Sequence, residues 1–207
     1  MANRAFLILA DSADPNAAYD DLDARVVAAA NSMLPVLWFS AFSRHDVYWR
    51  TLASNSAGDE RDKVLADEHG DDGDGNVAAY PVLLAPVDTA RQRARERKAL
   101  FLTRFPSSLE SVYDDWLALL DGIDAPYLLV EAVELWSMGK PTEFEALLDA
   151  CARAFEADDP RDWDMLLGQT AGMRYNIITE HVLFLDDRHL TIELHGYEWM
   201  RPVPWLE

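Results

Sequence analysis

Short apolar runs alternate with polar, turn-rich segments in the first part of the chain. Residues 4–10 form a nearly continuous apolar run that is too short for a typical helix, so they predict a buried, central strand. Residues 25–30 predict a second strand, although their alanines are nearly as compatible with a helix. Residues 77–85 predict a further strand, and Pro81 places it at a sheet edge or at a bulge because proline cannot donate to a neighbouring strand.

An apolar segment with helical features follows the first predicted strands. Ser32 can cap a helix that runs to Phe42 and has Pro35 in its first turn, where the missing N–H costs nothing. This helix is apolar on nearly all sides and is therefore expected to be buried, with Trp38 and Phe39 in the core.

Capping signals followed by a 3.6-residue period predict four more helices, and Trp116 lies on the apolar face of the second. The predicted helices are Asp88 to Phe105, a helix from the capping box Ser107 and Glu110 to Gly122, a helix after Pro141 with the capping box Thr142 and Glu145, and Asp159 to Leu167, stopped by Gly168. Between the second and third of them, residues 126–138 predict one mostly apolar strand.

The C-terminal part changes to a period of two. Residues 178–184 and 190–194 can form an antiparallel hairpin, which would place His181, Glu193 and His195 on its polar side. Strands at both ends of the chain with helices between them indicate an α+β fold. We therefore expect a single α+β domain with a mixed or antiparallel sheet, several packed helices and a C-terminal β-hairpin.

The charge of the chain bears on the class of molecule that it could bind. The chain has a formal net charge of -19. Residues 57–76 hold eight acidic and only two basic residues, which indicates a flexible acidic loop within the domain. Such a field opposes binding to nucleic acid or to anionic membranes and favours a basic protein partner, although acidity for solubility alone explains it equally well.

Candidate chemistry is sparse. Gly139 to Thr142 lacks the spacing of a phosphate loop, and residues 72–76 lack the glycine and glutamate that a calcium loop requires. Cys151 is the only cysteine and lies on an apolar helix face, so it is expected to be a core residue in a reducing compartment. With no signal peptide and no apolar run of membrane-spanning length, a cytoplasmic location is expected. The basic run from Arg91 to Lys98 is interpreted as a solvated helix face, with docking of an acidic partner as the alternative.

Two short segments carry a resemblance. Residues 1–7 (MANRAFL) and 31–35 (NSMLP), the latter leading into an apolar helix, resemble a loose family of uncharacterised bacterial proteins of similar length. Small, acidic, Trp-rich proteins of this kind look like immunity proteins, which neutralise a bacterial toxin. The resemblance implies a role and no particular residues.

Three functional hypotheses follow. The first is an immunity protein, not an enzyme, that binds a basic toxin and occludes its active site, with no cofactor or metal. The second is an enzyme with a site at His181, Glu193 and His195. The third is an adaptor subunit. For the first, the expected partner-binding residues are Asp59, Glu60, Asp67, Glu68, Asp71, Asp72, Asp74, Trp199 and Trp205.

Overall fold

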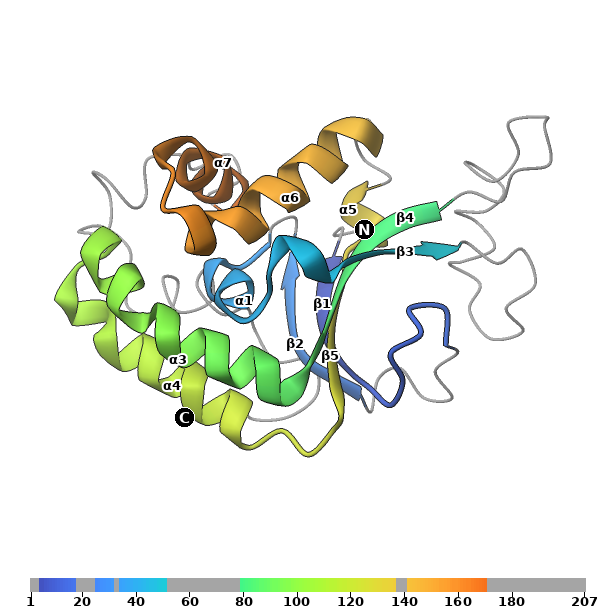
Figure 1. Cartoon of the computed structure of the whole chain (residues 1–207), viewed down its shortest axis with the longest axis horizontal. Coiled ribbons are helices and arrows are strands. Elements are labelled where there is room, and N and C mark those ends of the chain that lie inside the picture. Colours follow the sequence, from blue (N-terminus) through green and yellow to red (C-terminus); the bar gives the residue numbers. More distant parts are fainter. Residues whose placement is uncertain (1–3, 18–24, 32–33, 52–78, 137–140, 171–207) are drawn as a thin grey trace.

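The computed structural model describes residues 4–17, 25–31, 34–51, 79–136 and 141–170. Within them, one five-stranded antiparallel sheet has the strand order β2-β1-β5-β4-β3 and is packed with several helices (Figure 1). This confirms the predicted α+β class with an antiparallel sheet; the predicted hairpin over 178–194 lies outside the described residues. The strands are β1 (Arg4–Ala10), β2 (Val26–Asn31), β3 (Val47–Thr51), β4 (Ala79–Pro86) and β5 (Tyr127–Glu131).

The interior strands follow the apolar pattern. β1 lies between β2 and β5, so its predicted central position is confirmed, and residues 26–31 adopt the strand rather than the helix. The prediction that Pro81 places its strand at an edge or at a bulge is wrong, because β4 lies between β5 and β3 and its two pairings run without a register shift. Proline is tolerated there because β5 pairs only with Leu83 to Pro86 and has ended before it reaches Pro81.

The prediction of one strand over 126–138 is also wrong. β5 ends at Glu131, and a short helix, α5 (Val133–Trp136), follows. The Glu131 side chain accepts the backbone N–H of Val133 at 3.1 Å, which favours a turn at this point over a continued strand.

Helices α1, α3, α4, α6 and α7 gather on one side of strands β1, β2 and β5 in Figure 1, whereas α5 contacts β1 and β4. Helix α3 contacts α1, α4 and α6, so it is central to the helical layer, and α6 packs on α7. The longer helices are α1 (Val36–Ala41), α3 (Val87–Arg104), α4 (Glu110–Asp121), α6 (Pro141–Ala157) and α7 (Pro160–Thr170), and the 3₁₀ turns are η2 (Arg44–Asp46) and η3 (Ser107–Leu109).

Prolines, rather than the predicted polar caps, mark where most helices start. Pro35 and Pro86, both extended, are the N-caps of α1 and α3, and α6 begins at Pro141. Neither Ser32 nor Asp88 is therefore a cap, and Thr142 lies inside its helix. The fixed φ of proline suits a helix start and leaves no N–H unsatisfied there.

Two other predicted boundaries differ. Ser107 opens a 3₁₀ turn, so α4 starts after Leu109 and the expected capping box with Glu110 does not form. The C-cap of α4 at Gly122 is confirmed. Helix α7 continues through Gly168 to Thr170, since a glycine inside a helix costs only about 1 kcal/mol relative to alanine.

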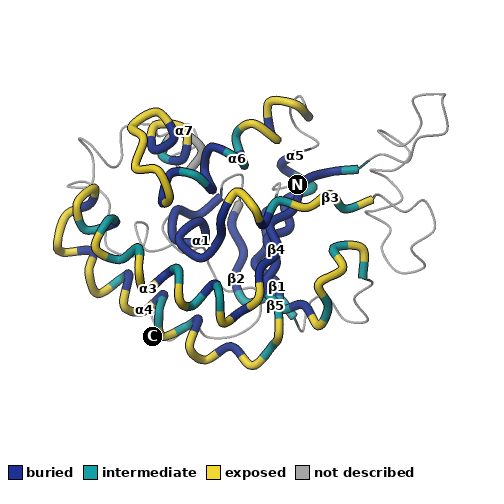
Figure 2. The backbone as a smooth tube through the Cα atoms, viewed as in Figure 1, coloured by how far each residue is buried: buried dark blue, intermediate teal, exposed yellow. Residues whose placement is uncertain are grey.

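The core lies between the sheet and the helical layer (Figure 2). All six residues of α1 are buried, as the apolar pattern predicted, and Trp38, Phe39 and Trp116 are core residues. The indole N–H of Trp116 donates to Oγ of Ser40 at 3.0 Å. The buried Trp116 indole therefore has its polar atom satisfied where α1 and α4 meet.

Candidate functional site

The residues proposed from sequence for partner binding lie outside the described part of the chain. The same holds for the alternative enzymatic trio His181, Glu193 and His195, so these expectations stay predictions. Cys151 is fully buried on α6, and burial raises the pKa of its thiol above the usual range. A buried, protonated thiol is a core residue, in agreement with its interpretation from sequence.

The basic residues of α3 are bonded within the molecule. Arg93 bonds Asp46, Arg95 bonds Asp121, and Lys98 lies 2.7 Å from Asp114. Arg95 stays 54% exposed, as expected for a solvated face, but the ion pairs leave the α3 cations already paired and poorly suited to dock an acidic partner. They bind η2 and α4 to α3.

Arg97 has the most buried position among these cations. Its side chain is 12% exposed and donates to the carbonyls of Ser40 at 3.0 Å, Phe39 at 3.3 Å and Phe42. Burial lowers the pKa of the guanidinium, while Glu156 opposes this shift. Arg97 thus satisfies carbonyls at the C-terminal end of α1, which has no basic residue of its own in its last turn.

Many carboxylates, by contrast, point to solvent. Within the described ranges, several exposed acidic residues form no salt bridge. They include Asp14, Glu96, Asp115, Asp124, Glu145 and Asp164. Because the α3 cations are paired internally, the described part of the molecule presents a surface dominated by negative charge.

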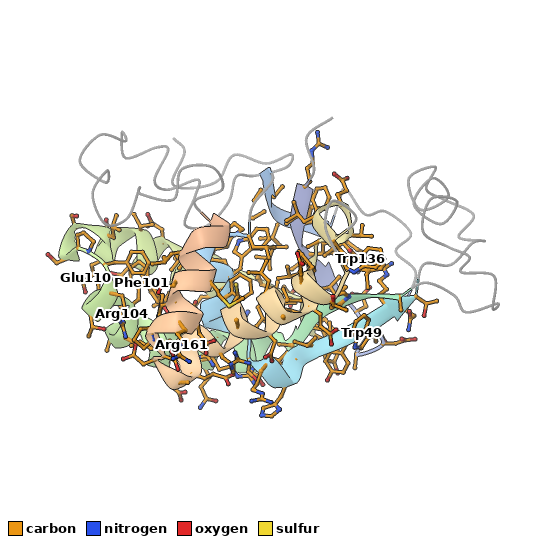
Figure 3. The ribbon with its side chains drawn as sticks, turned by 90° about the horizontal axis from the view of Figure 1, so that it is seen from above. Trp49, Phe101, Arg104, Glu110, Trp136 and Arg161 are labelled. Atoms are coloured by element: carbon orange, nitrogen blue, oxygen red, sulfur yellow. The ribbon has the colours of Figure 1, made fainter. Side chains whose placement is uncertain are left out.

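Strand β3 carries the large exposed aromatic side chains. Among the strands that the structure describes, β3 lies at the edge of the sheet, and Tyr48 and Trp49 are 42% and 46% exposed. Of the large hydrophobic residues in the described segments, only Met165 on α7 is comparably exposed. Figure 3 shows Trp49 on this outer strand. Exposed aromatic side chains are typical anchors of protein interfaces.

Contacts at both ends hold β3 in place. Before it, Ser43 and Asp46 form a reciprocal capping box around η2, and Asp46 also bonds Arg93 of α3. After it, the backbone N–H of Thr51 donates to Oδ1 of Asn16 at 2.7 Å. The exposed strand is therefore held by the body of the protein before it meets any partner.

A buried carboxylate holds the middle of β3. Arg50 donates to Glu131 at 3.0 Å across β4, and the hydroxyl of Tyr80 donates to the same oxygen at 2.9 Å. Glu131 is only 7% exposed and accepts the Val133 N–H with its other oxygen, so both carboxylate oxygens have hydrogen-bond donors. We interpret this group as a structural link between the edge strand and the centre of the sheet.

Sequence reasoning missed β3. Its residues Val47, Tyr48, Trp49 and Thr51 all favour strands, and this enrichment was the available signal. The strand lacks a regular alternation of apolar and polar positions, because its exposed residues are the neighbouring Tyr48 and Trp49.

No other chemistry is apparent in the described segments. They contain no group of at least three His, Cys, Asp or Glu residues that could hold a metal ion. None of the helices searched there combines the length and the apolar character needed to cross a bilayer. Comparison of the chain with protein-family models, with curated proteins and with solved structures finds no match.

Proposed function

We propose that the chain is a binding protein that neutralises a more basic protein, a bacterial toxin, by occluding its active site. The observation that supports this best is the edge strand β3, which is held by contacts at both ends and exposes Tyr48 and Trp49 on an otherwise acidic molecule. We further propose a cytoplasmic location, where such a protein would meet a toxin that has entered the cell.

Electrostatic attraction and the burial of aromatic side chains would make separate contributions to binding. The net charge of -19 accelerates encounter with a cationic surface and selects against acidic partners. Aromatic side chains then supply most of the affinity once they are desolvated, in an interface of roughly 800 Å² per partner. Tyr48 and Trp49 are suited to this second part because their backbone is already ordered.

The direct test is co-expression with the products of the two flanking genes. A basic product should co-purify with the chain, and its toxicity to the host cell should be suppressed. Raising the salt concentration from 0.05 to 0.5 M should lower the association rate by roughly ten- to a hundredfold, because screening removes the long-range attraction.

The control is a chain in which the exposed carboxylates Glu145 and Asp164 are changed to glutamine and asparagine. Its association should be slower, with little change in the dissociation rate. Failure of both flanking products to bind, together with no protection of the host cell, would contradict the proposal.

A further inference from the structure

The direction of the backbone groups on β3 can be read from its pairing with β4. Residues on paired antiparallel strands alternate between hydrogen-bonded and non-hydrogen-bonded pairs. Thr51 lies opposite Ala79, yet its N–H donates to Asn16 rather than across to β4. The pair of Thr51 and Ala79 is therefore of the non-hydrogen-bonded kind.

A second observation gives the same register. Trp49 lies opposite Pro81, which has no N–H to offer to β3. Counting in steps of two from Thr51, Trp49 and then Val47 are also in non-hydrogen-bonded pairs. Their N–H and C=O groups point away from β4, toward the open edge, while those of Tyr48 and Arg50 point toward β4.

The side chains at this edge lie on both faces of the sheet. Successive residues of a strand point to opposite faces, so Tyr48 shares the face of Arg50 and Glu131 whereas Trp49 is on the other face. An added strand would therefore meet an aromatic neighbour on each face as well as the outward backbone groups of Val47 and Trp49.

From this geometry we propose that the outer edge of β3 receives an extended, basic segment of the partner protein as an additional strand beside β3. Main-chain hydrogen bonds to Val47 and Trp49 would provide affinity, and alternate side chains of the segment would contact Tyr48 and Trp49. This inference rests on the proposed function, since it specifies how the basic partner is bound.

The net charge of the chain favours a basic segment of another protein over a second copy of the chain at the β3 edge. Two copies of a chain with a net charge of -19 repel one another, so pairing of β3 with its copy in a second molecule is disfavoured. A segment rich in lysine or arginine and in β-branched residues is complementary to the net negative charge of the chain and prefers the extended conformation. Natural proteins usually protect exposed edges with charge or proline, and β3 instead presents aromatic side chains.

The test uses a defined probe, an octapeptide of alternating lysine and valine, with amide hydrogen exchange measured by NMR. In the free protein, the amides of Tyr48 and Arg50 should exchange slowly and those of Val47 and Trp49 rapidly. Saturating peptide should slow exchange at Val47 and Trp49 by at least roughly tenfold. The same peptide with every residue N-methylated has no N–H group to offer on either edge and should give no protection, and a helical lysine–alanine peptide of equal charge is the second control.

Two substitutions distinguish the contribution of the Trp49 backbone N–H to peptide binding from that of its side chain. Trp49→Ala should weaken peptide binding by at least about fivefold through loss of the ring. Trp49→Pro also removes the outward N–H and should weaken binding further. Equal affinities of these two variants, or peptide binding without protection at Val47 and Trp49, would overturn the inference.

The outcomes also distinguish the two proposals. A flanking-gene product that binds tightly but leaves the Val47 and Trp49 amides unprotected would overturn the edge-strand mode and leave the binding function standing. Protection of both amides by the peptide, with no flanking product bound, would support the edge-strand mode while contradicting the proposed function.

Discussion

Replacing Arg97 with methionine tests whether the cations of α3 act inside the molecule. The Arg97 guanidinium donates to the carbonyls of Phe39, Ser40 and Phe42, and its side chain is only 12% exposed. Methionine fills similar space but leaves these carbonyls without their donor, and each unsatisfied buried acceptor costs about 1 to 3 kcal/mol. Partial access of water to this site favours the lower part of the total, so Arg97→Met should lower the free energy of unfolding by about 3 kcal/mol.

Arg95→Met is the matched control on the same helix. The side chains of Arg95 and its partner Asp121 are 54% and 49% exposed, and an exposed ion pair contributes at most about 1 kcal/mol. Urea unfolding measures both values, and Tm should fall by about 6 to 12 °C for Arg97→Met but by less than about 4 °C for Arg95→Met. Equal, small losses would refute the idea that Arg97 satisfies the end of α1.

Three other outcomes are expected. Trp116→Ala should lower the free energy of unfolding by about 3 to 5 kcal/mol, whereas Trp49→Ala should change it by less than about 1 kcal/mol, as measured by urea unfolding; similar values would contradict their different burial. Tyr48→Pro should destabilise the protein by at least about 1 kcal/mol more than Trp49→Pro in the same assay, because only the Tyr48 N–H points to β4; the reverse order would show that the register is wrong. Burial raises the pKa of Cys151 and of Tyr113 in the folded state, so above about pH 9 the unfolded chain loses protons first and the free energy of unfolding should fall with rising pH. Cys151→Ala should make this fall less steep in unfolding measured from pH 8 to 10.5, and an unchanged pH dependence would contradict the role of the buried thiol.

Elements defined by local apolar pattern could be predicted from the sequence. The run over 4–10 and the all-round apolar segment from Val36 have only one way to hide their side chains, which is burial in the sheet centre and in the helical layer. The amphipathic face that includes Trp116 likewise predicts a helix with that side chain in the core.

Features set by distant contacts could not be predicted. The end of β5 depends on how the Glu131 side chain is shared between Val133 and Arg50, which is remote in sequence. The helix starts were assigned to polar residues such as Asp88, but the preceding proline had already determined the backbone.

The candidate site also depends on distant contacts that the local sequence pattern does not reveal. Sequence reasoning assigned binding to the acidic segment and to Trp199 and Trp205, which stay predictions because they lie outside the described residues. It could not find the β3 edge, because the position of Trp49 at an open edge follows from strand order and from the Asn16 and Glu131 contacts. Strand order is a property of the whole sheet and leaves no local signature in the sequence.

The most direct test of the account is the affinity of the flanking-gene product for the wild-type chain and for Trp49→Ala, measured by isothermal titration calorimetry at low salt. The account predicts that the wild-type chain binds and that Trp49→Ala weakens binding by about tenfold or more, with Tm nearly unchanged because Trp49 is 46% exposed. Equal dissociation constants for the two proteins would contradict the claim that the aromatic edge of β3 is the binding surface.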